Sequence, residues 1–161
     1  DCPVVNVSWY GAKAFADCVG GALPTEAQWE FACRGGLEET PFGLGNGLDL
    51  TGDIAHIRAT DRKTTAPVGS YSPNGFDLYD LHGNVSEWVA DWFDANYYGG
   101  SGGFAWNPTG PKTGTGKVVR GGDFTMDKLS CRCAARVYCS PRVTNMLIGF
   151  RVSFDQDMKW E

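Results

Sequence analysis

Six cysteines are the residues of this sequence best suited to chemistry, because thiolates can attack, be oxidised or bind metal. They are Cys2, Cys18, Cys33, Cys131, Cys133 and Cys139. They form no paired CxxC motifs, so their spacing does not predict zinc, and they are too few for a disulfide scaffold of this length. Cys131 and Cys133 would share one face of a strand, but two thiolates alone make a poor metal site. Ordinary core or surface thiols are the favoured interpretation.

The two histidines, His56 and His82, are the other candidates for catalysis or metal binding. Neither has a serine or cysteine at the spacing of a catalytic motif, so a catalytic triad or a zinc site is not favoured. We expect each histidine to lie in a turn or at the surface.

The chain carries a formal net charge of −5 and contains no run of lysine or arginine. Binding to a nucleic-acid backbone needs clustered cations, so nucleic acid is not expected as a partner. No apolar run approaches the roughly 20 residues that span a bilayer, so no membrane span is expected. The start at Asp1 lacks the features of a signal peptide, and we expect the chain to be the C-terminal part of a longer protein of open cellular location.

Two helices are predicted near the N-terminus of what we expect to be a single domain over residues 1–161. Ser8 can cap a helix whose apolar residues recur with a 3.6-residue period until the glycines at 20–21 end it. Thr25 and Gln28 form a capping box that begins a second helix, which the glycines at 35–36 end.

Irregular structure and short strands are predicted for the rest of the chain. Residues 36–72 and 97–116 are glycine-rich without sustained periodicity, and neither segment contains a phosphate-binding motif. Short β-prone runs at 117–120, 131–135 and 148–154 predict a small antiparallel sheet. Helices followed by strands give the order of an α+β protein.

Four sequence blocks together point to a known family. They are PVVNVSW (3–9), LPTEAQWEFACRGG (23–36), GNVSEW (83–88) and the module from RGG (120–122) to GFR (149–151). These blocks resemble the formylglycine-generating enzyme (sulfatase-modifying factor) family over nearly the whole chain. The resemblance implies a C-type-lectin-like α+β fold that is loop-rich, with two helices and a small twisted antiparallel sheet.

The active-site cysteines of that family are the residues on which activity would depend. The resemblance implies that the family's oxidase holds copper with two cysteines that follow a Gly-Gly pair. Here Met126 stands in place of the first, Asp123 replaces an expected serine, and Cys131 alone could match the second. A lone thiol cannot form a dithiolate metal site. We therefore predict that the chain is not an enzyme, and we expect no copper.

Residues 120–152 resemble the variable region of proteins that are diversified by retroelements. The recurring frame of that region is matched by RGG at 120–122, by RxAxR at 132–136, by Pro141 and by IGFR at 148–151. The residues between these positions are predicted to vary and to bind ligand: Thr125, Met126, Asp127, Ser130, Val137, Tyr138, Cys139, Ser140, Val143, Asn145, Met146 and Leu147. A rigid scaffold tolerates many side chains at such exposed positions.

The resemblance further implies a calcium ion and a cysteine pair. The calcium ligands would be Asp80, Gly83, Val85 and Glu87, the first and last through carboxylates and the others through backbone oxygens. The alternative is that the two carboxylates bond nearby backbone amides and fix the turn. Cys33 and Cys133 align with a disulfide of secreted family members, so we expect them to be a close pair or a disulfide.

These observations predict a receptor-like protein without catalytic activity. Its C-terminal region would be diversified by a retroelement and would bind a protein or another macromolecular ligand. The alternatives are a formylglycine-generating oxidase and an accessory domain of a sulfoxide synthase. The resemblance implies a prokaryotic or phage origin.

Overall fold

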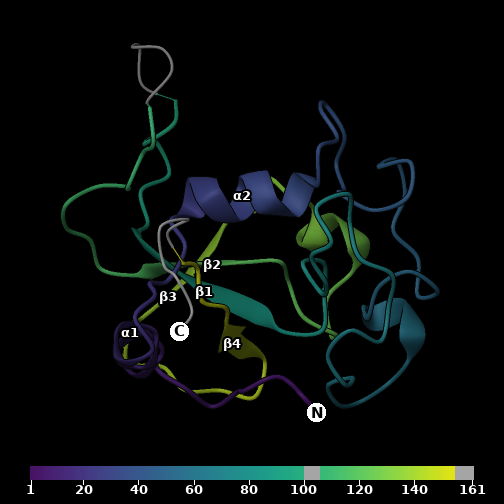
Figure 1. Ribbon diagram of the computed structural model, residues 1–161, viewed down its shortest axis with the longest axis horizontal. Coiled ribbons are helices and arrows are strands. Elements are labelled where there is room, and N and C mark those ends of the chain that lie inside the picture. The colour runs from purple at the N-terminus through teal and green to yellow at the C-terminus, as the bar shows by residue number, and fades with distance from the viewer. Residues whose placement is uncertain (100–105, 155–161) are drawn as a thin grey trace.

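The computed structural model describes residues 1–99 and 106–154 (Figure 1). Its helices are α1 (Trp9–Cys18) and α2 (Glu26–Arg34), with single 3-10 turns η1 (Arg58–Thr60) and η2 (Lys128–Cys131). Its strands are β1 (Ser86–Trp92), β2 (Lys117–Arg120), β3 (Val137–Cys139) and β4 (Ile148–Phe150). Loops connect these elements over most of the described chain, which confirms the predicted loop-rich α+β class. No helix within the described ranges is long and apolar enough to cross a bilayer.

Local capping signals set the limits of both helices, as predicted. The Ser8 hydroxyl accepts a hydrogen bond from the Gly11 amide at the start of α1. Thr25 and Gln28 form the expected reciprocal capping box at the start of α2. Gly35 ends α2 in the left-handed conformation (φ 57°), which glycine adopts at little cost.

The sheet is mixed rather than antiparallel, and its strand order is β3-β2-β1-β4. The pairs β1–β2 and β2–β3 are antiparallel, but β4 runs parallel to β1, with Ser86 opposite Ile148 and Trp88 opposite Phe150. Residues 140–147 cross from one edge of the sheet to the other and return the chain to the end where β1 begins. The prediction of an antiparallel sheet is therefore wrong for the pair β1 and β4.

One strand lies away from its predicted position, and another, β1, was not predicted at all. Residues 131–135 form no strand, because the Cys133 amide donates to Pro41 O (2.9 Å) in the irregular region instead of to the sheet. The strand lies further along, at β3. β1 was not recognised as a strand, because its consecutive residues Trp88 and Val89 are both fully buried and the usual alternation of polar and apolar residues is missing.

The buried side chains form three clusters around the sheet. One joins α1 to one face of the sheet through Trp9, Ala12, Ala16, Trp88, Val119 and Ile148. The second joins α2 to the opposite face through Trp29, Cys33, Val89, Val118 and Cys133, and α2 lies across the sheet in Figure 1. The third lies inside the irregular region and contains Phe42, Leu50, Ala55, Ile57 and Cys131. This third cluster gives residues 42–57 a small core of their own, beside the candidate site.

Candidate functional site

Two separate segments of the predicted variable region meet in one cavity. Thr125, Met146 and Leu147 line a cavity of about 500 Å³ over the buried ring of Phe124. Met146 is 50% exposed, Thr125 is exposed and Leu147 is half-buried. The structure therefore brings these three predicted residues together at a surface that a ligand can reach.

The turn after β2 places Thr125 at this cavity. Gly121 (φ 90°) and Gly122 (φ 70°) are both left-handed, and a Cβ on Gly122 would lie 2.6 Å from Cys131 Sγ. Only glycine fits this position without strain. The buried carboxylate of Asp123 then accepts hydrogen bonds from the backbone amide (2.9 Å) and the hydroxyl (2.6 Å) of Thr125. The backbone and the hydroxyl of Thr125 are thus held by Asp123, while the residue as a whole stays exposed.

The irregular region supplies the opposite wall of the cavity through Arg58, Asp61, Arg62 and Lys63. We call this cavity the variable pocket; its lining is Arg58, Asp61, Arg62, Lys63, Phe124, Thr125, Met146 and Leu147. None of these four wall residues was predicted from the sequence. Three cations between positions 58 and 63 of an acidic chain were a local signal, but their distance in sequence from Thr125 concealed the contact.

Arg58 and His56 hold this wall in place. The Arg58 amide donates to Met126 O (2.9 Å), and Arg58 Nε donates to Thr125 O (2.7 Å). His56 is buried, with Nε2 2.8 Å from Thr64 O and Nδ1 3.0 Å from the Thr60 hydroxyl. Both histidines are therefore buried rather than at the surface, and His82 is only 2% exposed. His82 does lie in a bend, next to Gly83 (φ 81°), as the turn alternative expected.

The remaining predicted variable residues do not gather at the variable pocket. Val137 and Tyr138 are exposed on β3, where Tyr138 stacks on Phe93 with ring centroids 4.6 Å apart. In Figure 1, β3 lies well to the left of the lime-coloured turn η2. Asp127 caps η2 through Ser130, and the Asn145 side chain accepts from the Leu147 amide. Of the others, Ser140 is exposed, and Met126, Cys139 and Val143 are half-buried.

The structure also brings Cys33 and Cys133 together. Their Sγ atoms are 3.1 Å apart, and both residues are fully buried between α2 and the sheet. Burial raises the pKa of Cys33. The hydrogen bond from Cys33 lowers the pKa of Cys133, which makes Cys133 the more nucleophilic sulfur of the pair.

His82 lies beside the two thiols, with Nε2 3.5 Å from Cys33 Sγ and 3.9 Å from Cys133 Sγ. These three are the described residues whose donor atoms could surround a metal ion. However, His82 Nδ1 donates to Cys131 O (2.7 Å), and Nε2 accepts from the Gly43 amide (2.9 Å). The imidazole has no free lone pair, so the cluster offers two thiols and fits no third ligand.

Met126 and Cys131, the positions compared with the family's copper cysteines, lie in the third core cluster. Met126 packs against that cluster from its edge, and Cys131 is fully buried within it. Burial raises the pKa of Cys131 to about 12, so its sulfur is held as a thiol at neutral pH. The two positions therefore serve packing in this fold.

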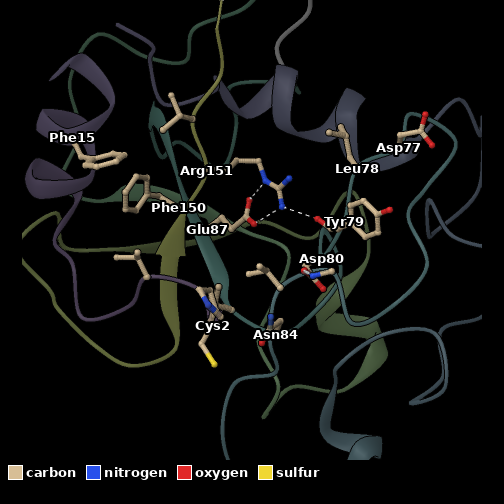
Figure 2. A pocket seen from close by; sticks show the side chains of 16 residues that line it. Cys2, Phe15, Asp77, Leu78, Tyr79, Asp80, Asn84, Glu87, Phe150 and Arg151 are labelled. Atoms are coloured by element: carbon tan, nitrogen blue, oxygen red, sulfur yellow. Dashed lines mark hydrogen bonds and ion pairs between the residues drawn. The ribbon is translucent and has the colours of Figure 1, made fainter. Parts of the chain in front are cut away.

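Three of the four predicted calcium ligands, Asp80, Val85 and Glu87, line a second cavity of about 630 Å³ (Figure 2). Glu87 Oε2 accepts from Trp29 Nε1 (2.7 Å) and Arg151 Nε (2.6 Å), and Oε1 accepts from Arg151 Nη2 (2.7 Å). Asp80 Oδ2 accepts from the Gly69 amide (2.7 Å). A cation at Glu87 would have to displace Arg151, which already neutralises it. The Glu87 carboxylate is thus committed to Trp29 and Arg151, which disfavours calcium in this arrangement. Binding of calcium by these residues remains an untested prediction.

Comparisons with known proteins agree on one family. The model of the sulfatase-modifying factor enzyme 1-like domain matches residues 1–156. The formylglycine-generating enzymes of Thermomonospora curvata and Streptomyces coelicolor are 40% and 41% identical over 95% and 97% of this chain. The chain spans about half the length of these relatives, 55% and 54%.

A solved structure, Treponema denticola variable protein 1, superposes on 94% of this chain and 70% of its own with a TM-score of 0.84 at 28% identity. This likeness confirms the predicted fold and the resemblance to a variable protein. It supports a function in ligand binding without identifying the ligand.

The prediction that the chain is not an enzyme is contradicted. Relatives that match almost the whole chain are named formylglycine-generating enzymes. The close contact of Cys33 and Cys133 also provides a thiol pair of the kind that redox chemistry uses. The prediction relied on the cysteines that follow Gly122 and gave no weight to this distant pair. Family membership rests on the whole chain rather than on one motif: this chain belongs to the formylglycine-generating enzyme (sulfatase-modifying factor) family.

Proposed function

We propose that this domain binds a macromolecular ligand, a segment of another protein, at the variable pocket. The observation that carries the proposal is that Thr125 and the pair Met146 and Leu147, from separate parts of the predicted variable region, line one cavity. Binding sites are commonly carried on loops that a rigid scaffold holds in place, and Asp123 and Arg58 hold the backbone here. The likeness to a solved variable protein supports the same function.

We further propose that a retroelement diversifies residues 120–152 in order to change this surface. The test is to sequence the DNA downstream of the gene. A near-copy of the segment that encodes residues 120–152, differing at adenines and lying beside a reverse transcriptase gene, would support the proposal. Without such a copy, the residues at the variable pocket would be products of ordinary divergence.

The two groups of predicted variable residues can be separated by mutation. A phage-displayed library of random peptides is the probe, selected on the immobilised domain. For the selected peptides, Met146→Ala should weaken binding about tenfold or more, because buried anchor side chains at interfaces contribute ~2 kcal/mol or more. Tyr138→Ala, an equally exposed position on β3, should change the affinity less than about twofold, which is well under 1 kcal/mol.

The affinities would be measured by biolayer interferometry after thermal melts have shown that both variants fold. Greater sensitivity to Tyr138→Ala than to Met146→Ala would move the ligand surface to β3 and contradict the proposed site. Failure to select any peptide that depends on Met146 would do the same.

Oxidation of a substrate cysteine is a second candidate function, which the contact of Cys33 with Cys133 and the names of the relatives favour. The test supplies copper, oxygen and a cysteine-containing peptide, and follows the peptide by mass spectrometry. An oxidase of this type would pass two electrons and two protons from the cysteine CH2–SH group to oxygen, and water would then replace the sulfur, which leaves as hydrogen sulfide, to give the formylglycine aldehyde. Cys33→Ala would abolish the conversion. An unchanged peptide mass would remove this candidate.

A further inference from the structure

The charge around the variable pocket is opposite to that of the whole chain. The chain has a formal net charge of −5, yet Arg58, Arg62 and Lys63 line the pocket against a single acid, Asp61. Asp127 lies near enough to Arg58 to have its pKa lowered in part by that cation, after the larger effect of its own bond from the Ser130 amide. With Asp127 counted, the cations are still in excess at this site.

Two of the three cations are available to a ligand. Lys63 pairs with Asp61, but both side chains are almost fully exposed, at 85% and 88%. Solvent screens such an exposed pair strongly, so a ligand carboxylate can replace it at little cost. Arg62 is exposed beside Lys63 on the same wall. Arg58, by contrast, uses its Nε to hold Thr125 O.

The base of the pocket is apolar and firmly supported. The buried Phe124 ring stacks on His56 with centroids 5.6 Å apart and planes 15° apart. Tyr71 also stacks on His56, at 6.4 Å. Met146 and Leu147 continue this apolar surface towards solvent. Aromatic and methionine side chains of this kind are favoured as contacts for apolar groups of a partner.

We infer that the variable pocket takes an acidic peptide segment that carries an apolar side chain. The apolar side chain packs on Phe124, Met146 and Leu147, and flanking carboxylates face Arg62 and Lys63. This inference rests on the proposed function, because it names the chemical class of ligand for the same pocket. The combination of a cationic wall with an apolar base selects against a basic peptide, and also against a purely polar acidic one.

The test uses fluorescein-labelled synthetic peptides and fluorescence anisotropy. The first peptide alternates Glu and Leu, the second replaces Glu with Lys, and the third replaces Leu with Ser. The Glu-Leu peptide should bind at least about tenfold more tightly than either of the others, and more weakly as salt is raised. An unlabelled oligodeoxythymidine of similar charge should not displace the Glu-Leu peptide. Competition by the oligonucleotide, or tighter binding of the Lys-Leu peptide, would overturn the inference.

Charge-reversed variants locate the effect. Arg62→Glu and Lys63→Glu should each weaken binding of the Glu-Leu peptide by about tenfold, since like charges then face each other. The matched control is Lys13→Glu on α1, which makes the same change in net charge at an exposed position outside the pocket lining. It should alter the affinity less than about twofold, within the range of screened distant charges. Equal weakening by all three variants would mean that net charge alone controls binding, which contradicts the inference.

The peptide selection distinguishes failure of this inference from failure of the proposed function. Selected peptides that depend on Met146 but lack acidic residues would refute the acidic class and leave the binding site in place. A selection without any peptide that depends on Met146 would refute the site itself.

Discussion

Replacing Arg120 with methionine should lower the free energy of unfolding by about 3 to 5 kcal/mol, although methionine keeps the unbranched stem of the side chain. The Arg120 side chain is fully buried, and its Nη2 donates to Glu30 Oε2 (2.5 Å) and Cys133 O (2.7 Å). Its Nη1 donates to Ala135 O (2.5 Å) and lies 3.7 Å from Glu26 Oε1. Methionine would leave buried oxygens without a donor, and such groups are costly to desolvate.

Urea unfolding followed by tryptophan fluorescence measures this loss. Arg34→Met is the matched control, because Arg34 also pairs with Glu30 but its side chain is 29% exposed. We expect it to cost about 1 kcal/mol or less, as partly exposed pairs of neighbouring turns do. If the two variants lose the same stability, the buried cation is not what holds the segment at 133–135 against α2.

Oxidation of Cys33 and Cys133 to a disulfide should raise the melting temperature more than a substitution of any exposed residue would. The two sulfurs are already 3.1 Å apart, and the bond would close a loop of 100 residues along the chain. In the chain-entropy model such a loop gains about 4 to 5 kcal/mol, although measured gains are often smaller. Oxidised glutathione is the oxidant in the experiment. The rate should increase with pH as the Cys133 thiol, whose pKa is lowered by Cys33, becomes a thiolate.

Alkylation with mass spectrometry counts the free thiols, and melts with and without reductant measure the gain in stability. The Cys33→Ala variant should show no melting shift that depends on reductant. A shift that persists in this variant would assign it to other cysteines, such as the exposed Cys2 and Cys18.

Features that depend on a few neighbouring residues could be predicted from the sequence. The capping box of Thr25 and Gln28 and the glycine at 35 defined α2, because the hydrogen bonds they make are local. β1 could not be predicted in the same way, since Trp88 and Val89 are buried by different helices on opposite faces. The parallel pairing of β4 with β1 likewise depends on where residues 140–147 cross the sheet.

At the variable pocket, too, local features could be predicted from the sequence and features that depend on distant contacts could not. The sequence frame identified Thr125, Met146 and Leu147, but only the fold separates them from Tyr138 on β3. The cationic wall at 58–63 reaches Thr125 through contacts between distant parts of the chain, so no local pattern could connect the two. The close pair of Cys33 and Cys133 was expected from the family resemblance. The prediction of no catalytic activity, however, was based on Met126 and Cys131 and did not consider this pair.

The attachment of Arg58 explains how this surface can change without loss of the fold. Arg58 bonds to the carbonyl oxygens of residues 125 and 126, atoms that every amino acid possesses. Replacement of either side chain therefore leaves both hydrogen bonds from Arg58 in place, because they depend on the main chain and not on the identity of residues 125 and 126. If position 125 varies as proposed, a new side chain there gives up the bond from the Thr125 hydroxyl to Asp123 but keeps both bonds made by Arg58.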